Sequence, residues 1–70
     1  MGDLHFKVNY KPLWKLLIDK EINKSELRAK TKIAPSTFSK MANNENVSLD
    51  VLVRICKALD CGLDDIVEIE

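Results

Sequence analysis

The chain has 70 residues, and its 11 basic and 11 acidic side chains give a formal net charge of zero. This length allows one domain at most, and a core of this size is marginal unless helices pack efficiently or two copies associate. The 46% hydrophobic content, with two glycines and two prolines, favours a compact, mostly helical globule. No apolar run reaches about 18 residues and no signal-peptide pattern is present, so we expect a cytoplasmic protein that does not enter a membrane.

The zero net charge hides an uneven distribution along the chain. Residues 7–40 contain nine Lys or Arg and three acids, whereas residues 41–70 contain two basic and seven acidic side chains, and Asp3 supplies one more negative charge. A basic first half and an acidic second half give one face that suits phosphates and one that does not. The alternative is that both are ordinary solvated surfaces.

The reactive side chains give no support to an enzyme. Cys56 and Cys61 fit two free thiols, buried as small apolar residues in a reducing compartment, with a disulfide as the alternative. His5 is the only histidine, which is too few for a zinc site or for a Cys–His nucleophile. Because no catalytic constellation or glycine-rich phosphate loop is present, we expect no catalysis, no metal and no small-molecule cofactor.

Short extended segments are predicted at both ends of the chain. Residues 5–10 (HFKVNY) alternate loosely between apolar and polar side chains, and residues 66–70 (IVEIE) are rich in β-branched ones. The two segments can pair as a small antiparallel ladder, within one subunit or across a dimer. We expect residues 1–70 to form a single domain, with residues 1–9 as an N-terminal arm or strand and residues 10–67 as the helical core.

The first helix is predicted from about Tyr10 to Lys20. Pro12 fits its first turn, where the missing N–H costs nothing. Apolar residues at helical spacing mark the buried face, and Trp14 lies at its border. The residues of this stripe are Leu13, Leu16, Leu17 and, beyond the end of the helix, Ile22.

Residues 22–41 (INKSELRAKTKIAPSTFSKM) predict two short helices joined by a tight turn. Asn23 fits the N-cap of the first helix, and Glu26 three residues later completes a capping-box pattern. Leu27 is the expected buried anchor of this helix. Ile33 lies in the turn, where it can fill the space between helices.

The second helix of this pair begins at Pro35 and directs Phe38 and Met41 inward at i and i+3. Its outer side has few bulky groups. A helix of this kind after a tight turn is what a helix-turn-helix protein needs to enter the major groove of DNA. The polar residues 43–46 that follow show no helical pattern and predict a loop.

The rest of the chain predicts one longer helix and one short helix. Ser48 fits the N-cap of a helix over residues 49–59. Gly62 fits a left-handed C-cap, and a fifth helix is expected from Leu63 to about Val67. The inner face of the fourth helix is expected to contain Val51 or Leu52, Ile55, Cys56 and Leu59.

This succession resembles the Cro/lambda-repressor-like helix-turn-helix regulators, also called the XRE family, over about residues 10–67. The order and spacing of the segments carry the resemblance, and no single segment does. It implies an all-α, compact five-helix fold, with short terminal β-strands as a possible addition. The segments are residues 22–27 (INKSEL), 33–41 (IAPSTFSKM), 47–52 (VSLDVL), 55–61 (ICKALDC) and 63–66 (LDDI).

Two positions depart from the family pattern. Arg28 stands where the family usually has a small residue, so its stem must bend out of the helix contact. Lys32 stands where the family usually has glycine at a positive φ, which costs a non-glycine residue about 1 kcal/mol. Both departures add positive charge near the expected DNA surface.

The resemblance implies a sequence-specific regulator of transcription, such as a repressor, with a recognition helix over about residues 35–42 in double-stranded DNA. Lys40 can donate to guanine, the serines can donate or accept, and proline or the threonine methyl can touch a thymine methyl. The expected base-reading residues are Pro35, Ser36, Thr37, Ser39 and Lys40. The alternative for these residues is an ordinary exposed helix surface.

Other residues are expected to hold DNA phosphates, which would position the protein and make its binding depend on salt. Lys24 and Ser25 follow a helix start, where the dipole favours an anion. The alternatives are solubility charges for the lysines and simple turn formers for the asparagines. The expected phosphate-binding residues are Lys24, Ser25, Lys32, Asn43 and Asn44, with Lys11 as a further candidate.

A single motif of this size buries too little surface for tight specific binding, so a homodimer reading two half-sites is expected. The expected interface residues are Leu63, Ile66, Val67 and Ile69, and the alternative is that they close the core of the monomer. A second function also stays open, namely a protein-binding adaptor or antitoxin-like partner that keeps this fold without reading DNA sequence. The near-neutral net charge and the atypical Arg28 and Lys32 favour that alternative, in which the acidic second half serves a partner.

Overall fold

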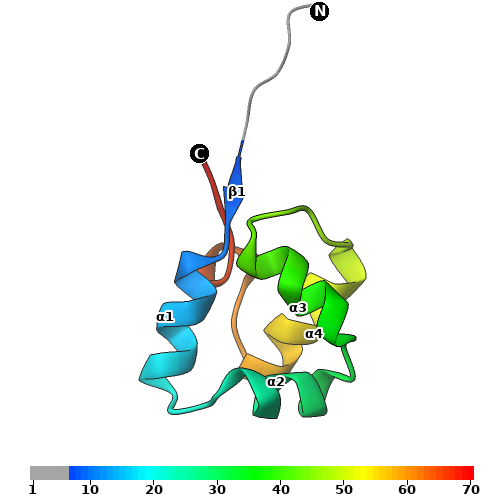
Figure 1. Ribbon diagram of the computed structural model, residues 1–70. Coiled ribbons are helices and arrows are strands. Elements are labelled where there is room, and N and C mark those ends of the chain that lie inside the picture. The colour runs from blue at the N-terminus through cyan, green and yellow to red at the C-terminus, as the bar shows by residue number, and fades with distance from the viewer. Residues whose placement is uncertain (1–6) are drawn as a thin grey trace, which may run out of the picture.

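The computed structural model describes residues 7–70, so His5 and Phe6 of the predicted first strand lie outside the described residues. Four α-helices and a small two-stranded sheet make up the described chain (Figure 1). The elements in chain order are β1 (Val8–Asn9), α1 (Lys11–Asp19), α2 (Lys24–Thr31), α3 (Pro35–Ala42), α4 (Leu49–Leu59), the 3-10 turn η1 (Leu63–Asp65) and β2 (Glu68–Ile69). The predicted helical fold with short terminal strands is confirmed.

The predicted fifth helix is wrong, because residues 63–65 form only one 3-10 turn. The Asp65 carboxylate accepts a hydrogen bond from the Gly62 N–H at 3.0 Å. The chain then leaves the helical conformation after Ile66 and enters β2. Pairing of this last segment with β1 therefore replaces the second turn that the pattern of acidic and apolar residues had indicated.

The predicted cap at Gly62 is also wrong. Asp60 is the left-handed residue that ends α4, with φ 53° and ψ 55°, and its N–H donates to the Cys56 carbonyl. Gly62 has an extended backbone at φ −95°, which any residue can adopt. Asp tolerates the left-handed region better than most residues do, so the turn comes two positions earlier than glycine preference suggested.

The two ends of the described chain lie side by side as an antiparallel ladder. Val8 is opposite Ile69 and Asn9 is opposite Glu68, so the strands pair within one chain. The buried Asn9 side chain donates to the Glu68 carboxylate at 3.4 Å and accepts from the N–H of Lys11 at 3.2 Å. This side chain therefore joins the ladder to the start of α1.

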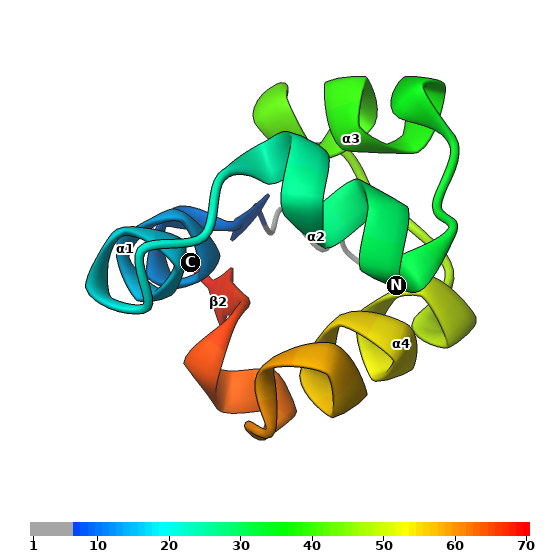
Figure 2. The same ribbon diagram turned by 90° about the horizontal axis from the view of Figure 1, so that it is seen from below.

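One apolar core connects all four α-helices. α2 lies against α4, and both α1 and α4 contact η1. Viewed from below, α2 lies between α3 and α4, and α3 forms an outer edge of the molecule (Figure 2). The core residues are Tyr10, Leu13, Leu17, Leu27, Ile33, Phe38, Met41, Ile55, Leu59 and Ile66. This list confirms the predicted anchors Leu27, Ile33, Phe38 and Met41.

Ile66 is a core residue of the single chain, with 0% of its surface exposed. It therefore has no surface to offer a second subunit, and its assignment to a dimer interface is corrected to the alternative, closure of the monomer core. Ile69 and Leu63 differ, because they are 74% and 41% exposed. Within residues 7–70, no helix has the length and apolar character that crossing a bilayer requires.

Candidate nucleic-acid interface

A capping box fixes the start of α2. The Asn23 side chain accepts from the N–H of Glu26 at 2.8 Å, and the Glu26 carboxylate accepts from the N–H of Asn23 at 3.4 Å. The predicted box is therefore confirmed. The box occupies the N–H groups of Asn23 and Glu26, and the exposed side chains of Lys24 and Ser25 lie between them at the start of the helix, where a phosphate can approach.

The turn between α2 and α3 is held by one strained residue and one buried residue. Lys32 adopts the left-handed conformation at φ 56° and ψ 34°, as its place in the turn predicted, and its N–H donates to the Arg28 carbonyl at 2.8 Å. Ile33 follows and is buried. The Lys32 side chain is exposed, so the strained backbone and the free charge occur in the same residue.

α3 has two different faces. Phe38 and Met41 are buried against the rest of the helices, and Met41 is 0% exposed. Ser36, Ser39 and Lys40 are exposed on the other side. Pro35 is also exposed at the first position of the helix, where its ring sets the helical φ, while Thr37 is half-buried. The structure thus places the predicted base-reading residues on one short helix, with Thr37 at its border.

Thr37 and Lys40 also line a pocket of about 350 Å³ between α3 and the start of α4. The other lining residues are Asn46, Val47, Ser48 and Val51. Ser48 caps α4 by accepting from the N–H of Val51 at 3.3 Å. The pocket extends the polar surface of α3 onto the loop that follows it.

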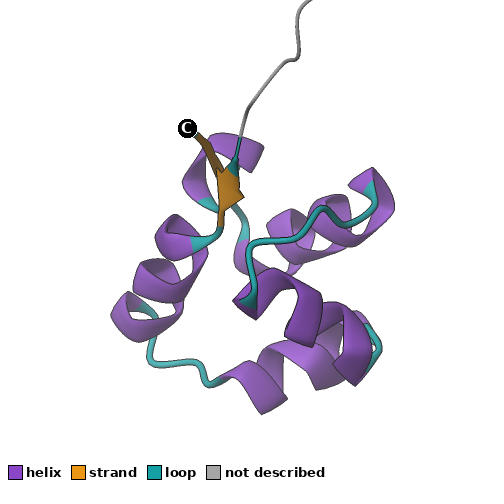
Figure 3. Ribbon diagram, turned by 45° about the horizontal axis from the view of Figure 1, so that its top comes forward, coloured by secondary structure: helices purple, strands orange, loops and turns teal. Residues whose placement is uncertain are grey.

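The loop after α3 is attached to the core by a contact that local sequence patterns did not indicate. The Tyr10 hydroxyl donates to the Glu45 carbonyl oxygen at 2.8 Å, and Tyr10 is only 2% exposed. Burial raises the pKa of Tyr10 above 10.0, against a smaller lowering by a hydrogen bond from the Val47 backbone. Figure 3 shows this loop as a long connection that passes from α3 to α4.

Asn43 and Asn44 both shape the end of α3. The N–H of Asn43 donates to the Ser39 and Lys40 carbonyls, and Asn44 takes a left-handed φ of 58°. Both side chains are exposed. Turn formation, the alternative for these asparagines, is therefore present, and the side chains stay open for contact with DNA.

The Lys24 side chain has a specific neighbour that sequence analysis missed. Its Nζ lies 4.3 Å from the centroid of the Trp14 ring, which is cation–π geometry. The two residues are ten positions apart and lie on different helices, so neither helical spacing nor a motif signals the contact. It forms because the turn after α1 brings the start of α2 beside Trp14.

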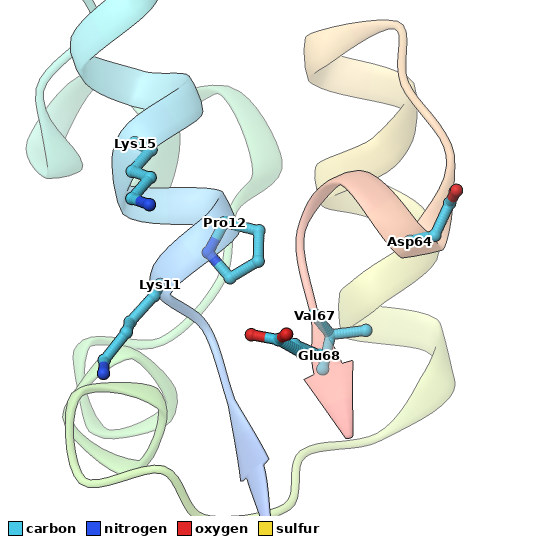
Figure 4. A pocket seen from close by; sticks show the side chains of 6 residues that line it. All are labelled: Lys11, Pro12, Lys15, Asp64, Val67 and Glu68. Atoms are coloured by element: carbon cyan, nitrogen blue, oxygen red, sulfur yellow. The ribbon is translucent and has the colours of Figure 1, made fainter. Parts of the chain in front are cut away.

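The further candidate Lys11 lies in a different setting. With Lys15 it lines a pocket of about 510 Å³ that also contains Asp64 and Glu68 (Figure 4). The lysines come from α1 and the acids from the C-terminal segment, so opposite charges share this pocket. Lys11 is therefore a weaker phosphate candidate than Lys24, because no acidic side chain lines the pocket that Lys24 borders.

Both cysteines are free and half-buried. The pKa of Cys61 is raised from 9.0 to about 11, chiefly by burial and then by the neighbouring Cys56. A thiol with this pKa is almost wholly protonated at neutral pH, and the thiolate is the reactive form. The structure thus agrees with structural thiols.

Comparison with known proteins agrees with this geometry. The model of the Cro/C1-type HTH DNA-binding domain matches residues 12–70. The chain belongs to this family. The chain resembles members of this family in the order of its helices, in the turn at Lys32 and in the two faces of α3.

One solved structure is similar over the whole chain. It is described as the crystal structure of the transcriptional regulator VanUg, Form II, and is 46% identical in sequence, with a TM-score of 0.94. The match covers 100% of this chain and 93% of that chain. No curated protein matches the sequence. The predicted resemblance to Cro-like helix-turn-helix regulators is confirmed by the family match.

Proposed function

We propose that this Cro/C1-type protein is a transcriptional regulator that binds double-stranded DNA in a sequence-specific manner, with α3 in the major groove. One observation carries the proposal, namely the opposite character of the two faces of α3. Phe38 and Met41 fix one face to the core, and the small or flexible polar side chains on the other face are free to approach base edges. Similarity to a protein described as a transcriptional regulator supports the same function.

Each predicted base-reading residue of α3 has a chemical role in this proposal. Lys40 donates to the O6 and N7 acceptors of guanine, which is the strongest discrimination available on this helix. Ser36 and Ser39 donate or accept and therefore discriminate weakly alone. Pro35 or the Thr37 methyl group contacts a thymine methyl.

Phosphate contacts flank the recognition helix on both sides. Lys24 and Ser25 precede it at the start of α2, Lys32 lies in the turn, and Asn43 and Asn44 follow it. All five side chains are exposed. Each phosphate that a lysine neutralises should contribute about −0.9 to the slope of log K against log salt.

We further propose a two-fold homodimer that reads half-sites about one helical turn of DNA apart. The exposed Leu63 and Ile69, with the half-buried Val67, are the apolar residues that the C-terminal segment offers to such an interface. Light scattering at micromolar concentration should give twice the chain mass. A monomeric mass, with and without DNA, would remove the dimer from the proposal.

The test of specific binding is a gel shift with duplexes selected from a random-sequence pool, at two salt concentrations. We expect selected duplexes to bind at least tenfold more tightly than bulk DNA, which corresponds to about 1.4 kcal/mol. If no duplex binds better than bulk DNA at low salt, the regulator proposal fails. The adaptor function, in which the fold binds a protein partner without reading DNA, would then be the better account.

A further inference from the structure

The Trp14–Lys24 pair is a part of the molecule that neither the core nor base reading explains. Lys24 Nζ lies 4.3 Å from the centroid of the Trp14 ring. Trp14 is half-buried, and Leu13 and Leu17 on the same helix are buried, so the ring is held by a fixed helix. Lys24 is exposed at the first position of α2.

The surroundings of the pair are mostly apolar. Both residues line a pocket of about 290 Å³ together with Leu17, Ile18 and Ile22, and Asn23 is its other polar residue. The ion pair found within residues 7–70 joins Arg54 to Asp50, so in the described chain no carboxylate holds the Lys24 ammonium. The aromatic face is therefore the partner that restrains this charge.

We propose that Trp14 is a positioning residue for DNA binding, which holds the Lys24 ammonium in place for a backbone phosphate. This inference rests on the proposed function. A free lysine side chain loses much rotamer freedom when it is fixed against a ligand, and that loss weakens binding. Contact with the Trp14 ring removes part of this freedom before DNA arrives.

The geometry leaves the ammonium able to bind phosphate. An ammonium group has three N–H donors, and the ring attracts the charge from one side only. In the view from below, the first turn of α2 is the end of that helix that lies nearer α3 (Figure 2), and the proposed phosphate site is at this end. The opposite possibility is that the ring withdraws the charge from DNA, which predicts tighter binding when the ring is removed.

A double-mutant cycle on DNA affinity tests the inference. We expect Lys24→Ala to weaken binding to all duplexes alike and to reduce the salt slope by about 0.9. Trp14→Leu should weaken binding about two- to fivefold, the strength expected for an exposed cation–π contact. In the Lys24→Ala background, Trp14→Leu should have no further effect, because the charge that it positions is gone.

The combination of Trp14→Leu with Lys32→Gly serves as the control. Lys32→Gly removes a proposed phosphate contact that is remote in sequence from Trp14 and keeps the left-handed backbone of the turn. The effects of Trp14→Leu and Lys32→Gly should therefore multiply. Circular dichroism checks that each variant keeps its helices, and if Trp14→Leu unfolds, Trp14→Phe replaces it, with coupling of the same sign but smaller size.

The outcomes separate this inference from the function on which it rests. If the unaltered chain binds no duplex at low salt, the proposed function fails, and the positioning role fails with it. If the unaltered chain binds but Trp14→Leu weakens binding equally with and without Lys24, the ring acts only through the fold and this inference alone is overturned. Unchanged or tighter binding by Trp14→Leu also overturns it.

Discussion

The Tyr10 hydroxyl lies 2.8 Å from the main-chain carbonyl oxygen of Glu45, and this hydrogen bond joins the start of α1 to the loop after the recognition helix. The two residues are 35 positions apart. The loop contains Asn43 and Asn44, so a bond to a buried tyrosine fixes the segment that is proposed to meet DNA phosphates. One hydrogen bond therefore links the core of the fold to the loop of the proposed DNA interface.

Removing this hydroxyl should loosen the loop without opening the core. Tyr10→Phe keeps the buried ring and should lower the free energy of unfolding by about 1 kcal/mol, the net value of a neutral hydrogen bond. DNA affinity should fall about twofold or more through the asparagine contacts. Urea unfolding and gel shift measure the two effects, and Glu45→Ala, which keeps the carbonyl acceptor, should change stability by less than about 0.5 kcal/mol.

Lys32→Gly should separate stability from DNA binding. Glycine adopts the left-handed backbone of this turn without strain, so the free energy of unfolding should rise by about 1 kcal/mol. The lost charge should weaken DNA binding and reduce the salt slope by about 0.9. Asp60→Gly is the matched control, because Asp60 is also left-handed but lies on the acidic half, so it should stabilise the protein without reducing the slope.

The two faces of α3 should respond in opposite ways to truncation. Met41→Ala leaves a cavity at a fully buried site and should cost about 2–5 kcal/mol, enough to unfold much of a domain of this size. Ser39→Ala alters an exposed side chain and should leave the melting temperature nearly unchanged while it shifts sequence preference. A large loss of stability from Ser39→Ala would contradict the assignment of its face.

The stability of the protein should fall between about pH 9 and pH 11. The pKa of Cys61 is about 11 in the folded chain, against 9.0 without the fold, so the folded state keeps a proton that the unfolded state loses. The contribution of Cys61 to stability is therefore complete below pH 9 and is lost as pH rises through the pKa of the folded state. Burial also raises the pKa of Tyr10, so Tyr10 lowers stability in the same direction at high pH. The measurement therefore compares how the free energy of unfolding changes with pH in the natural sequence and in Cys61→Ala. The fall should be shallower in Cys61→Ala. Equal slopes would contradict the role of Cys61.

Local patterns predicted much of this fold, because capping and apolar spacing act over a few residues. Asn23 with Glu26 marked the start of α2, and Ser48 marked the start of α4 at the residue where the structure begins it. The prediction failed where two local preferences competed and where a long-range contact overrode a local one. Gly62 was a plausible cap, but Asp60 takes the left-handed conformation first, and pairing with β1 ends η1 after one turn.

The parts of the interface that sequence could not predict depend on contacts between distant residues. Tyr10 with Glu45, and Trp14 with Lys24, meet only because the helices pack. Burial of Ile66 has the same origin, since a β-branched residue near the chain end is equally compatible with a core or with a partner surface. The exposed residues of α3 were predictable, because the spacing of residues within a single helix determines which face is buried and which is exposed.

The central claim is that α3 reads bases. The most direct test is the DNA sequence preference of two lysine variants, one on α3 and one outside it. The measurement compares Lys40→Ala and Lys24→Ala for affinity on a selected duplex and on bulk DNA. We predict that Lys40→Ala reduces the ratio of specific to bulk affinity about tenfold, whereas Lys24→Ala weakens both alike and leaves the ratio unchanged. An equal, sequence-independent loss from both variants would contradict the account.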